Sequence, residues 1–386
     1  MFVATASTEL QPRWKKWRKA SNDSNSPPRE QDSYQNVPSG VPQLAREKKA
    51  CGRWELTPMK LATLMDGSAD GRLIVVSRDL SHAVAATDIA PSLRQALDLW
   101  PQCAPKLQQR ALMLESGEAA GITPFDPARA AAPLPRAPQF LDGSSFLSHG
   151  KRMVRAFKLS TASLEVNHPL MYQGASDAFL GAHAAMPLPS EEHGIDIEAE
   201  VGIITDAVPM AVTSEQAARH VRLLVLLDDV SLRRLLFGEM SLGFGMVQSK
   251  PTCVFSPVAV TPDELGDAWQ DGRMHLRMRV SINGKVLGDL ATSEMGYSFY
   301  DLIAHAARTR VLSAGTIIGS GTVSNEDEPA GNACIAERRA LEIIEHGLPK
   351  TDWLHFGDQV RIEVLDGAGQ SVFGAIDHTF VPLGCG

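Results

Sequence analysis

Apolar and polar side chains alternate most regularly in the stretch 195–201. Successive side chains of a β-strand point to opposite faces, so this alternation predicts a strand with one apolar and one acidic face. The apolar face would hold Ile195, Ile197, Ala199 and Val201, and the acidic face Asp196, Glu198 and Glu200. A half-solvated edge strand would explain the same pattern, and this stretch alone leaves that interpretation open.

Three further stretches near the start and the middle of the chain have the pattern of secondary-structure elements. Residues 60–65 and 72–78 read as two strands joined by the Asp- and Gly-rich turn 66–71. The continuous apolar run 223–227 is typical of a buried strand or helix, and it ends on Asp228 and Asp229. Such a run would bring its terminal carboxylate to the rim of a core.

Two hairpins are predicted in the second half of the chain. Alternation through 274–282 runs into Asn283-Gly284, a dipeptide that favours a tight hairpin turn. Alternation at Val360, Ile362 and Val364 stops before Asp366-Gly367 and predicts another.

Helices are predicted at two places. Residues 92–115 have helical character, which Pro101 and Pro105 should interrupt. Thr213-Ser214-Glu215-Gln216 fits a capping box, and the helix that it opens would carry Ala217, Val221 and Leu224 on one face. The pattern as a whole predicts a β-dominated α+β protein.

The chain divides into three parts by composition. Residues 59–138 form a small β-rich domain that ends in the Pro- and Ala-rich connection 124–138, and residues 139–386 form a larger domain. Residues 1–58 are polar and lack an amphipathic period, so we expect a disordered extension, with Met59 as the natural start.

Composition excludes several classes of protein. The total charge is −8, and residues 1–58 carry ten Lys or Arg against six Asp or Glu, which leaves −12 for the body and argues against nucleic-acid binding. No apolar run is long enough to span a bilayer, and the five scattered cysteines without a CxxC pair favour reduced thiols over disulfides or a zinc site. Gly319-Ser320-Gly321 lacks the lysine of a phosphate loop. A cytoplasmic enzyme fits these features.

Acidic residues supply the candidate chemistry. Glu198 and Glu200 would lie side by side, and Asp229 and Asp142 are further candidates, with His149 seven residues after Asp142. Carboxylates this close repel one another, and a hard divalent cation is one of the usual remedies, besides water or a shifted pKa. Each residue is a weak signal alone, because Asp142-Gly143 is also an ordinary turn sequence.

Seven motifs in order resemble the fumarylacetoacetate hydrolase family, in particular its bacterial members, from about residue 59 to 380. They are Asp142-Gly143-Ser144 with His149, Pro169-Leu170-Met171-Tyr172-Gln173-Gly174, Asp196-Ile197-Glu198-Ala199-Glu200, Asp229-Val230-Ser231-Leu232-Arg233, Gln248-Ser249-Lys250-Pro251, Gly319-Ser320-Gly321-Thr322-Val323-Ser324 and Cys334-Ile335-Ala336-Glu337. The resemblance implies a mixed β-sandwich roll preceded by a smaller β domain, and a homodimer. It also implies metal-dependent hydrolysis of a carbon–carbon bond in a 1,3-diketo acid.

The resemblance further implies a role for each site residue. The metal ligands would be Asp142, Glu198, Glu200 and Asp229, an all-oxygen set that favours Mg²⁺, Ca²⁺ or Mn²⁺ over zinc. His149 would be the general base and Glu337 the carboxylate that orients it. Arg233 and Lys250 would stabilise negative charge, and Tyr172, Thr322 and Ser144 would contact the substrate.

Two positions depart from the family pattern. Ser144 stands where its better-studied hydrolases carry a tyrosine, and Leu236 where they carry a glutamine. Both changes remove hydrogen-bond donors from the substrate side, which leaves a diketo acid other than fumarylacetoacetate open as the substrate. Three functions remain open: this hydrolase or a near relative, a lyase of the same fold such as a 2-keto-4-pentenoate hydratase or an acylpyruvate or oxaloacetate decarboxylase, and a metal-binding paralogue without catalysis. The predicted base, His149 with Glu337, favours hydrolysis.

Overall fold

A computed structural model of the chain describes residues 58–161 and 166–384, and the predicted extension 1–58 lies outside these residues apart from Pro58. Within the described residues, a large sheet of eleven strands forms the first layer. In spatial order its strands are β4 (Thr123–Pro124), β3 (His82–Ala85), β2 (Arg72–Val76), β1 (Lys60–Leu64), β13 (Ala259–Val260), β10 (Val221–Asp228), β9 (Ala199–Thr205), β18 (Ile317–Gly319), β5 (Phe140–Gly143) and β6 (Met171–Gly174), with β12 (Val254–Phe255) paired to β10.

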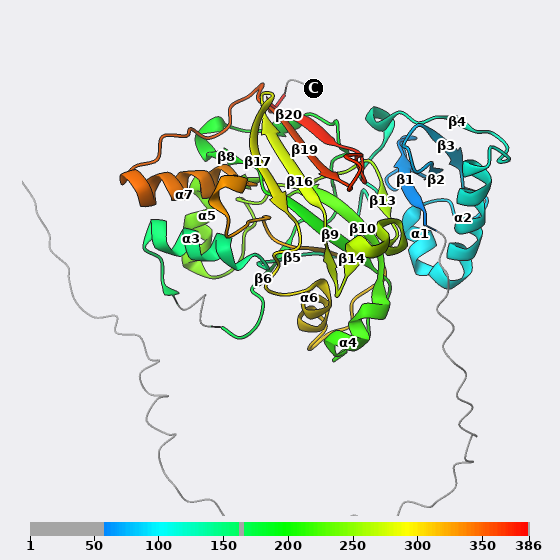
Figure 1. The fold of residues 1–386 in the computed structure, drawn as a ribbon, viewed down its shortest axis with the longest axis horizontal. Coiled ribbons are helices and arrows are strands. Elements are labelled where there is room, and N and C mark those ends of the chain that lie inside the picture. Colours follow the sequence, from blue (N-terminus) through cyan, green and yellow to red (C-terminus); the bar gives the residue numbers. More distant parts are fainter. Residues whose placement is uncertain (1–57, 162–165, 385–386) are drawn as a thin grey trace, which may run out of the picture. The chain divides into compact units, whose positions relative to one another are not determined.

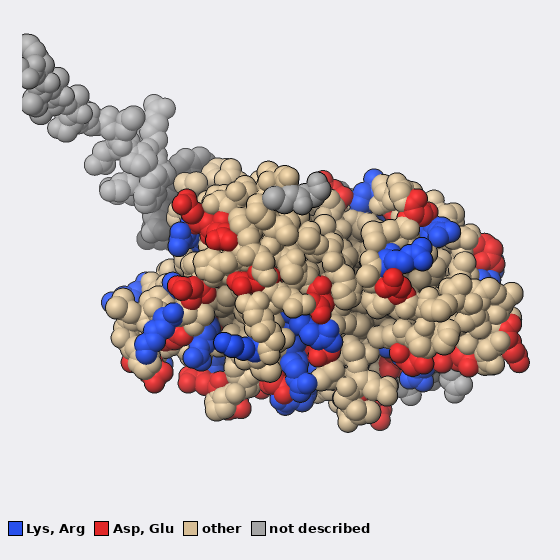
Figure 2. Space-filling model, turned by 90° about the horizontal axis from the view of Figure 1, so that it is seen from above, with Lys and Arg blue, Asp and Glu red and all other residues tan. Residues whose placement is uncertain are grey.

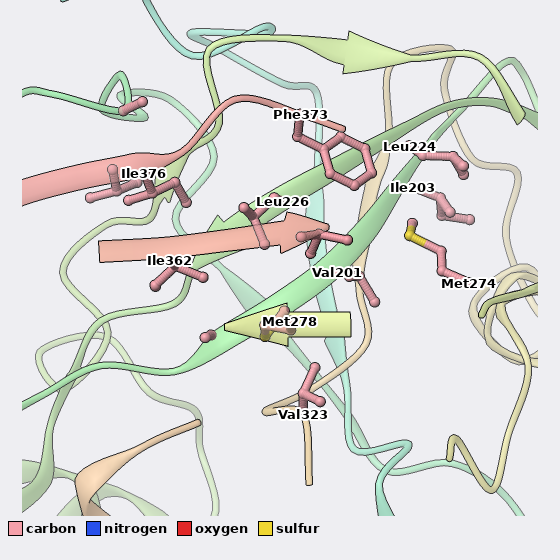
Figure 3. Packing of buried hydrophobic residues seen from close by; sticks show 14 of the residues in the cluster. Val201, Ile203, Leu224, Leu226, Met274, Met278, Val323, Ile362, Phe373 and Ile376 are labelled. Atoms are coloured by element: carbon pink, nitrogen blue, oxygen red, sulfur yellow. The ribbon is translucent and has the colours of Figure 1, made fainter. Parts of the chain in front are cut away.

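A second sheet of five strands packs against the first. Its order is β17 (Lys285–Ala291), β16 (Arg277–Ile282), β19 (Gln359–Leu365), β20 (Ile376–Pro382) and β7 (Met186–Leu188). Buried apolar side chains from both sheets meet in one cluster, in which Figure 3 shows Val201 and Leu226 facing Met278, Ile362 and Ile376. The pairs β18·β5 and β20·β7 are parallel while most others are antiparallel. The predicted β-dominated α+β fold with a mixed β-sandwich is therefore confirmed.

Residues near the start of the chain extend the large sheet. The predicted strands at 60–65 and 72–78 are β1 and β2, and β1 pairs with β13 through Lys60↔Val260 and Leu61↔Ala259. Helices α1 (Leu93–Asp98) and α2 (Trp100–Glu115) lie beside these strands in Figure 1 and bury their apolar faces against them. The helical prediction is right in extent, but the break falls at Leu99, and Pro105 lies inside α2 without ending it.

The acidic stretch 195–201 differs from a single edge strand. It forms β8 (Ile195–Asp196) and the start of β9, with Ile197 and Glu198 between the two strands. Strand β9 lies between β10 and β18, so it is central, and every residue from 195 to 201 is buried. The interpretation as a half-solvated edge strand is therefore wrong.

The helix predicted after Thr213 is much shorter than expected. Its capping box is present, but α4 (Ser214–Ala217) passes through one 3₁₀ turn, η5 (Ala218–His220), directly into β10. Val221 and Leu224 belong to β10, so their assignment to the helix is wrong. The apolar run 223–227, predicted to be a buried strand or helix, is a buried strand. Pairing of seven β10 residues with β9 outweighs the local helical signal.

Both predicted hairpins are present. Asn283 and Gly284 have φ angles of 51° and 74°, which suits the tight turn between β16 and β17. The alternating stretch 274–282 is divided, because β15 (Arg273–Met274) pairs with β14 (Trp269–Gln270) instead. Strands β19 and β20 are antiparallel neighbours as expected.

The remaining elements connect and flank the two sheets. They are η2 (Pro127–Arg129), α3 (Leu147–Phe157), η4 (Glu191–His193), β11 (Ser231–Leu232), α5 (Arg233–Leu242), η6 (Pro262–Ala268), α6 (Phe299–Ala306), η7 (Glu328–Ala330) and α7 (Ile335–His346). Every helix within residues 58–161 and 166–384 is too short or too polar to cross a bilayer. On the face in Figure 2, basic and acidic side chains lie interspersed.

Candidate metal centre and active site

Three buried carboxylates converge near the middle of the large sheet. Asp142 lies in β5, Glu200 in β9, and Asp229 directly follows β10. One oxygen from each lies within 4.8 Å of those of the other two. Strands β10, β9, β18 and β5 are consecutive in the sheet, so strand order alone brings together residues up to 87 positions apart in sequence.

Glycine in β18 makes room for this centre. A Cβ atom at Gly319 would lie 2.5 Å from Asp142 Oδ1 and 2.8 Å from Glu200 Oε2, closer than such atoms can approach. The backbone N–H of Gly321 donates to the same two oxygens, at 3.0 Å each. The backbone at Gly319, the last residue of β18, and at Gly321 thus forms a cradle for the two carboxylates.

The electrostatics of the centre favour a bound cation. Burial, and then the charge of Asp229, raise the pKa of Asp142 to about 7. Burial and the charges of Asp142 and Asp229 raise the pKa of Glu200 well above its usual value. Glu200 Oε1 is buried and has no hydrogen-bond partner among the described residues. An unpartnered oxygen among mutually repelling carboxylates fits a hard divalent cation such as Mg²⁺, Ca²⁺ or Mn²⁺.

Glu198, the fourth predicted ligand, is occupied by two cationic side chains. Arg233 Nη2 lies 2.6 Å from Glu198 Oε1, and Lys250 Nζ lies 2.5 Å from Glu198 Oε2. Burial raises the pKa of Glu198, but the charges of Lys250 and Arg233 outweigh it and hold this pKa below its usual range. Glu198 therefore stays ionised beside the three-carboxylate group without belonging to it.

Lys250 also contacts the three-carboxylate group itself. Its Nζ lies 2.7 Å from Asp229 Oδ2 and donates to the Asp229 carbonyl at 3.1 Å. Burial lowers the pKa of Lys250, but the charges of Asp229 and Glu198 outweigh that effect and raise it. The structure thus brings the two predicted cationic residues onto the predicted ligand set.

Asp196 is an important residue to which the sequence analysis gave no role. Its carboxylate accepts from Arg233 Nε at 2.8 Å and from the backbone N–H groups of Ile335 and Ala336, at 2.7 and 2.9 Å. These N–H groups open helix α7, so Asp196 ties Arg233 to that helix. The alternation in the sequence placed Asp196 on the same face as Glu198, and this position could have indicated a role for Asp196 in the site.

The predicted base and its carboxylate are in direct contact. His149 in α3 places Nδ1 2.6 Å from Glu337 Oε2 in the first turn of α7. Burial raises the pKa of Glu337, but the hydrogen bond from His149 and the charges of His149 and Arg152 outweigh it and hold the pKa below its usual value. An ionised Glu337 only accepts hydrogen bonds, so His149 Nδ1 carries the proton of this hydrogen bond.

Arg152 contacts Glu337 as well, although the sequence did not indicate it as a site residue. Its Nη1 lies 2.5 Å from Glu337 Oε1, which also accepts from Ser324 Oγ at 3.0 Å and Asn332 Nδ2 at 3.2 Å. Arg152 stands three residues after His149 on one face of α3, and that spacing was a usable signal.

The predicted substrate residues occupy different surroundings. The Tyr172 hydroxyl donates to Asp229 Oδ2, and Lys250 Nζ lies 5.4 Å from the centre of the Tyr172 ring. Thr322 is buried just after the Gly321 that contacts the carboxylates. Ser144 is exposed and lines a cavity of about 200 Å³ beside α3. Tyr172 thus joins the acidic centre directly, whereas Ser144 lies at its periphery.

Family models cover almost all of the described chain. Residues 139–381 match the fumarylacetoacetate (FAA) hydrolase C-terminal model, and residues 59–136 match fumarylacetoacetase N-terminal domain 2. The chain belongs to the fumarylacetoacetate hydrolase family. The expected family membership is therefore confirmed, and the chain is an enzyme of this family.

Relatives and solved structures in this family have several named activities. The chain is 29% identical over 203 residues to 2,4-didehydro-3-deoxy-L-rhamnonate hydrolase from Sphingomonas sp. (strain SKA58), covering 50% of this chain and 68% of that protein. A fumarylacetoacetate hydrolase from psychrophilic Exiguobacterium antarcticum matches in structure with a TM-score of 0.57 and 18% identity, over 84% of this chain and 99% of that one. For maleylpyruvate hydrolase from Sphingobium sp. SYK-6, the TM-score is 0.53 at 19% identity, over 84% of this chain and 100% of that one. The two structural matches support the fold alone.

The cradle at Gly319 gives a first prediction. Gly319→Ala should weaken Mn²⁺ binding about tenfold or more, because the added methyl group displaces the oxygens of Asp142 and Glu200. Gly238→Ala is the matched control, since a Cβ there meets nothing within 4 Å. Isothermal titration calorimetry measures the Mn²⁺ affinity of both variants. Equal affinities would show that metal binding does not depend on the absence of a side chain at residue 319.

Proposed function

We propose that this enzyme is a metal-dependent hydrolase that cleaves a carbon–carbon bond in a 1,3-diketo acid. The observation that carries the proposal is a histidine–carboxylate dyad beside a buried three-carboxylate centre. Arg233 links the two groups, because it contacts both Glu198 and Asp196, and Asp196 accepts from the backbone N–H of Ala336, next to Glu337. Water activation needs a base and enolate chemistry needs a cation, and this arrangement offers residues suited to both.

Asp142, Glu200 and Asp229 would hold the cation, whereas Glu198, the fourth ligand that the family resemblance implies, is engaged by Arg233 and Lys250. A divalent cation bound there supplies a Lewis acid that polarises the keto oxygen of the substrate. Glu198 holds Lys250 and Arg233 by direct contact. These two cationic groups would stabilise the negative charge that develops on the substrate.

His149 would take the proton from the attacking water at Nε2. Glu337 holds the opposite nitrogen and stabilises the imidazolium that forms. The water hydroxyl joins the carbonyl carbon, the adjacent carbon–carbon bond breaks, and the leaving carbon takes up the proton that His149 removed from the water. The products are a carboxylic acid and a shorter keto acid.

Two substrates merit testing first. Fumarylacetoacetate is the substrate implied by the family, and it would place the enzyme at the end of aromatic amino-acid breakdown. The 29% identical relative is a 2,4-didehydro-3-deoxy-L-rhamnonate hydrolase, which supports hydrolysis and offers the second candidate. Ser144 and Leu236 lack the phenol and amide donors of the better-studied hydrolases, which favours an acid with fewer acceptor groups near these positions.

A substrate panel with product identification tests the proposal. The full chain with Mn²⁺ or Mg²⁺ is given fumarylacetoacetate, 2,4-didehydro-3-deoxy-L-rhamnonate, an acylpyruvate, oxaloacetate and 2-keto-4-pentenoate. We expect loss of diketo-acid absorbance and two acid products from at least one diketo acid. Decarboxylation or hydration without carbon–carbon hydrolysis would replace the proposal with a lyase, and no turnover with any acid would leave a metal-binding paralogue.

We also propose that the enzyme is a homodimer, as the family resemblance implies. Light scattering coupled to size exclusion should then give twice the chain mass of 41.7 kDa. A mass equal to one chain at micromolar concentration would contradict the dimer.

A further inference from the structure

Helix α5 and the loop after it connect the two cationic residues of the site. Arg233 is the first residue of α5, and Lys250 follows the loop that begins at Gly243. Gly243 has a φ of 74° and Gly245 a φ of 140°, conformations that glycine adopts far more readily than other residues. A glycine-containing loop needs further contacts to hold Lys250 in one place.

Glu239 provides these contacts from the middle of α5. Its Oε1 accepts from the backbone N–H groups of Val247 at 3.1 Å and Gln248 at 2.9 Å. Its Oε2 accepts from Ser249 N at 3.0 Å and Ser249 Oγ at 2.5 Å. The hydrogen bonds from Ser249 and Gln248 hold the pKa of Glu239 below its usual value, so the carboxylate is ionised at neutral pH.

Ser249 is held from its other side as well. Its carbonyl accepts from the Leu232 N–H at 2.8 Å, next to Arg233. Glu239 itself is only partly buried, whereas Ser249 and Lys250 are buried. A partly exposed carboxylate therefore determines the backbone course that leads into a buried lysine.

We propose that Glu239 is a positioning residue, which braces the loop 247–249 against α5 and thereby holds Lys250 Nζ on Glu198 and Asp229. Its effect on turnover rests on the proposed function, whereas its effect on Lys250 does not. Both cationic groups contact Glu198 from opposite ends of the braced segment, Arg233 at 2.6 Å and Lys250 at 2.5 Å. Loss of the brace should release the lysine and leave Arg233 held by Asp196.

Acylation of Lys250 tests the brace without metal or substrate. The full chain is treated with an N-hydroxysuccinimide ester, and mass spectrometry follows the labelling of Lys250 against the exposed Lys151 as an internal reference. Glu239→Ala should raise the relative labelling rate of Lys250 at least about tenfold, since hydrogen bonds to a charged group are lost. Glu345→Ala, at an exposed carboxylate of α7, is the matched control and should change nothing.

Two further variants separate positioning from a general loss of folding. Glu239→Gln keeps one carbonyl acceptor but presents an amide donor to the N–H groups, so its labelling rate should fall between parent and Glu239→Ala. Ser249→Ala removes only one of the four hydrogen bonds and should give a smaller increase. This graded order remains testable if Glu239→Ala fails to fold.

Kinetics supply the second measurement. With the diketo acid that the panel identifies, Glu239→Ala should lower kcat about tenfold and leave KM within about twofold, because Lys250 acts on developing charge. Unchanged Lys250 labelling in folded Glu239→Ala would overturn the proposal, whatever the activity. A parent enzyme without diketo-acid turnover would defeat the proposed function, while increased Lys250 labelling would still support the brace.

Discussion

Replacing Glu200 with glutamine should lower the affinity for Mn²⁺ by more than about 100-fold, because even residues behind the ligands of a metal site contribute roughly 10- to 100-fold. Glutamine keeps the size of the side chain and its hydrogen bond from Gly321, but it removes one of the three converging charges. Activity at limiting Mn²⁺ should fall with the affinity.

The metal-free fold should tolerate this change. Burial and the charges of Asp142 and Asp229 raise the pKa of Glu200, so its ionised form destabilises the folded state at neutral pH. The neutral glutamine removes that cost, and the melting temperature should stay equal or rise. Glu192→Gln, at an exposed carboxylate, is the control. Parental Mn²⁺ affinity in Glu200→Gln, or full activity in metal-limited buffer, would refute the metal centre.

Replacing His149 with alanine should reduce kcat by roughly 10²- to 10⁴-fold, the usual contribution of a positioned proton transfer, while Mn²⁺ affinity is retained. The base and the three-carboxylate centre are separate groups of residues, so kcat should fall while the affinity for Mn²⁺ stays unchanged. His346→Ala, at a partly exposed histidine of α7, is the control.

Glu337→Gln should be milder in kcat than His149→Ala. The amide still contacts His149 but no longer stabilises the imidazolium. It also leaves the buried Arg152 without its carboxylate, so the melting temperature should fall. A His149→Ala enzyme that cleaves the diketo acid at the parental rate would exclude the hydrolytic role, and decarboxylation of oxaloacetate as the surviving reaction would favour the lyase.

Local patterns predicted much of the sandwich because they report which side chains face the core. Alternation at Val360, Ile362 and Val364 corresponds to β19, since every second side chain of a strand enters the same layer. Asn283-Gly284 is a turn for an equally local reason, as both residues adopt positive φ. Membership of the family was also evident from the motifs.

Only tertiary structure decided the elements and contacts that depend on distant partners. Val221 and Leu224 fit a helix locally, but pairing with β9 makes them strand residues. Asp142 and Glu200 meet because β18 lies between their strands, and no local pattern encodes that neighbour. The partners of Asp196 and Arg152 are likewise far away in sequence. The sequence by itself determined which side chains are apolar, turn-forming or ionisable, whereas sheet order and burial decided which charges share one site.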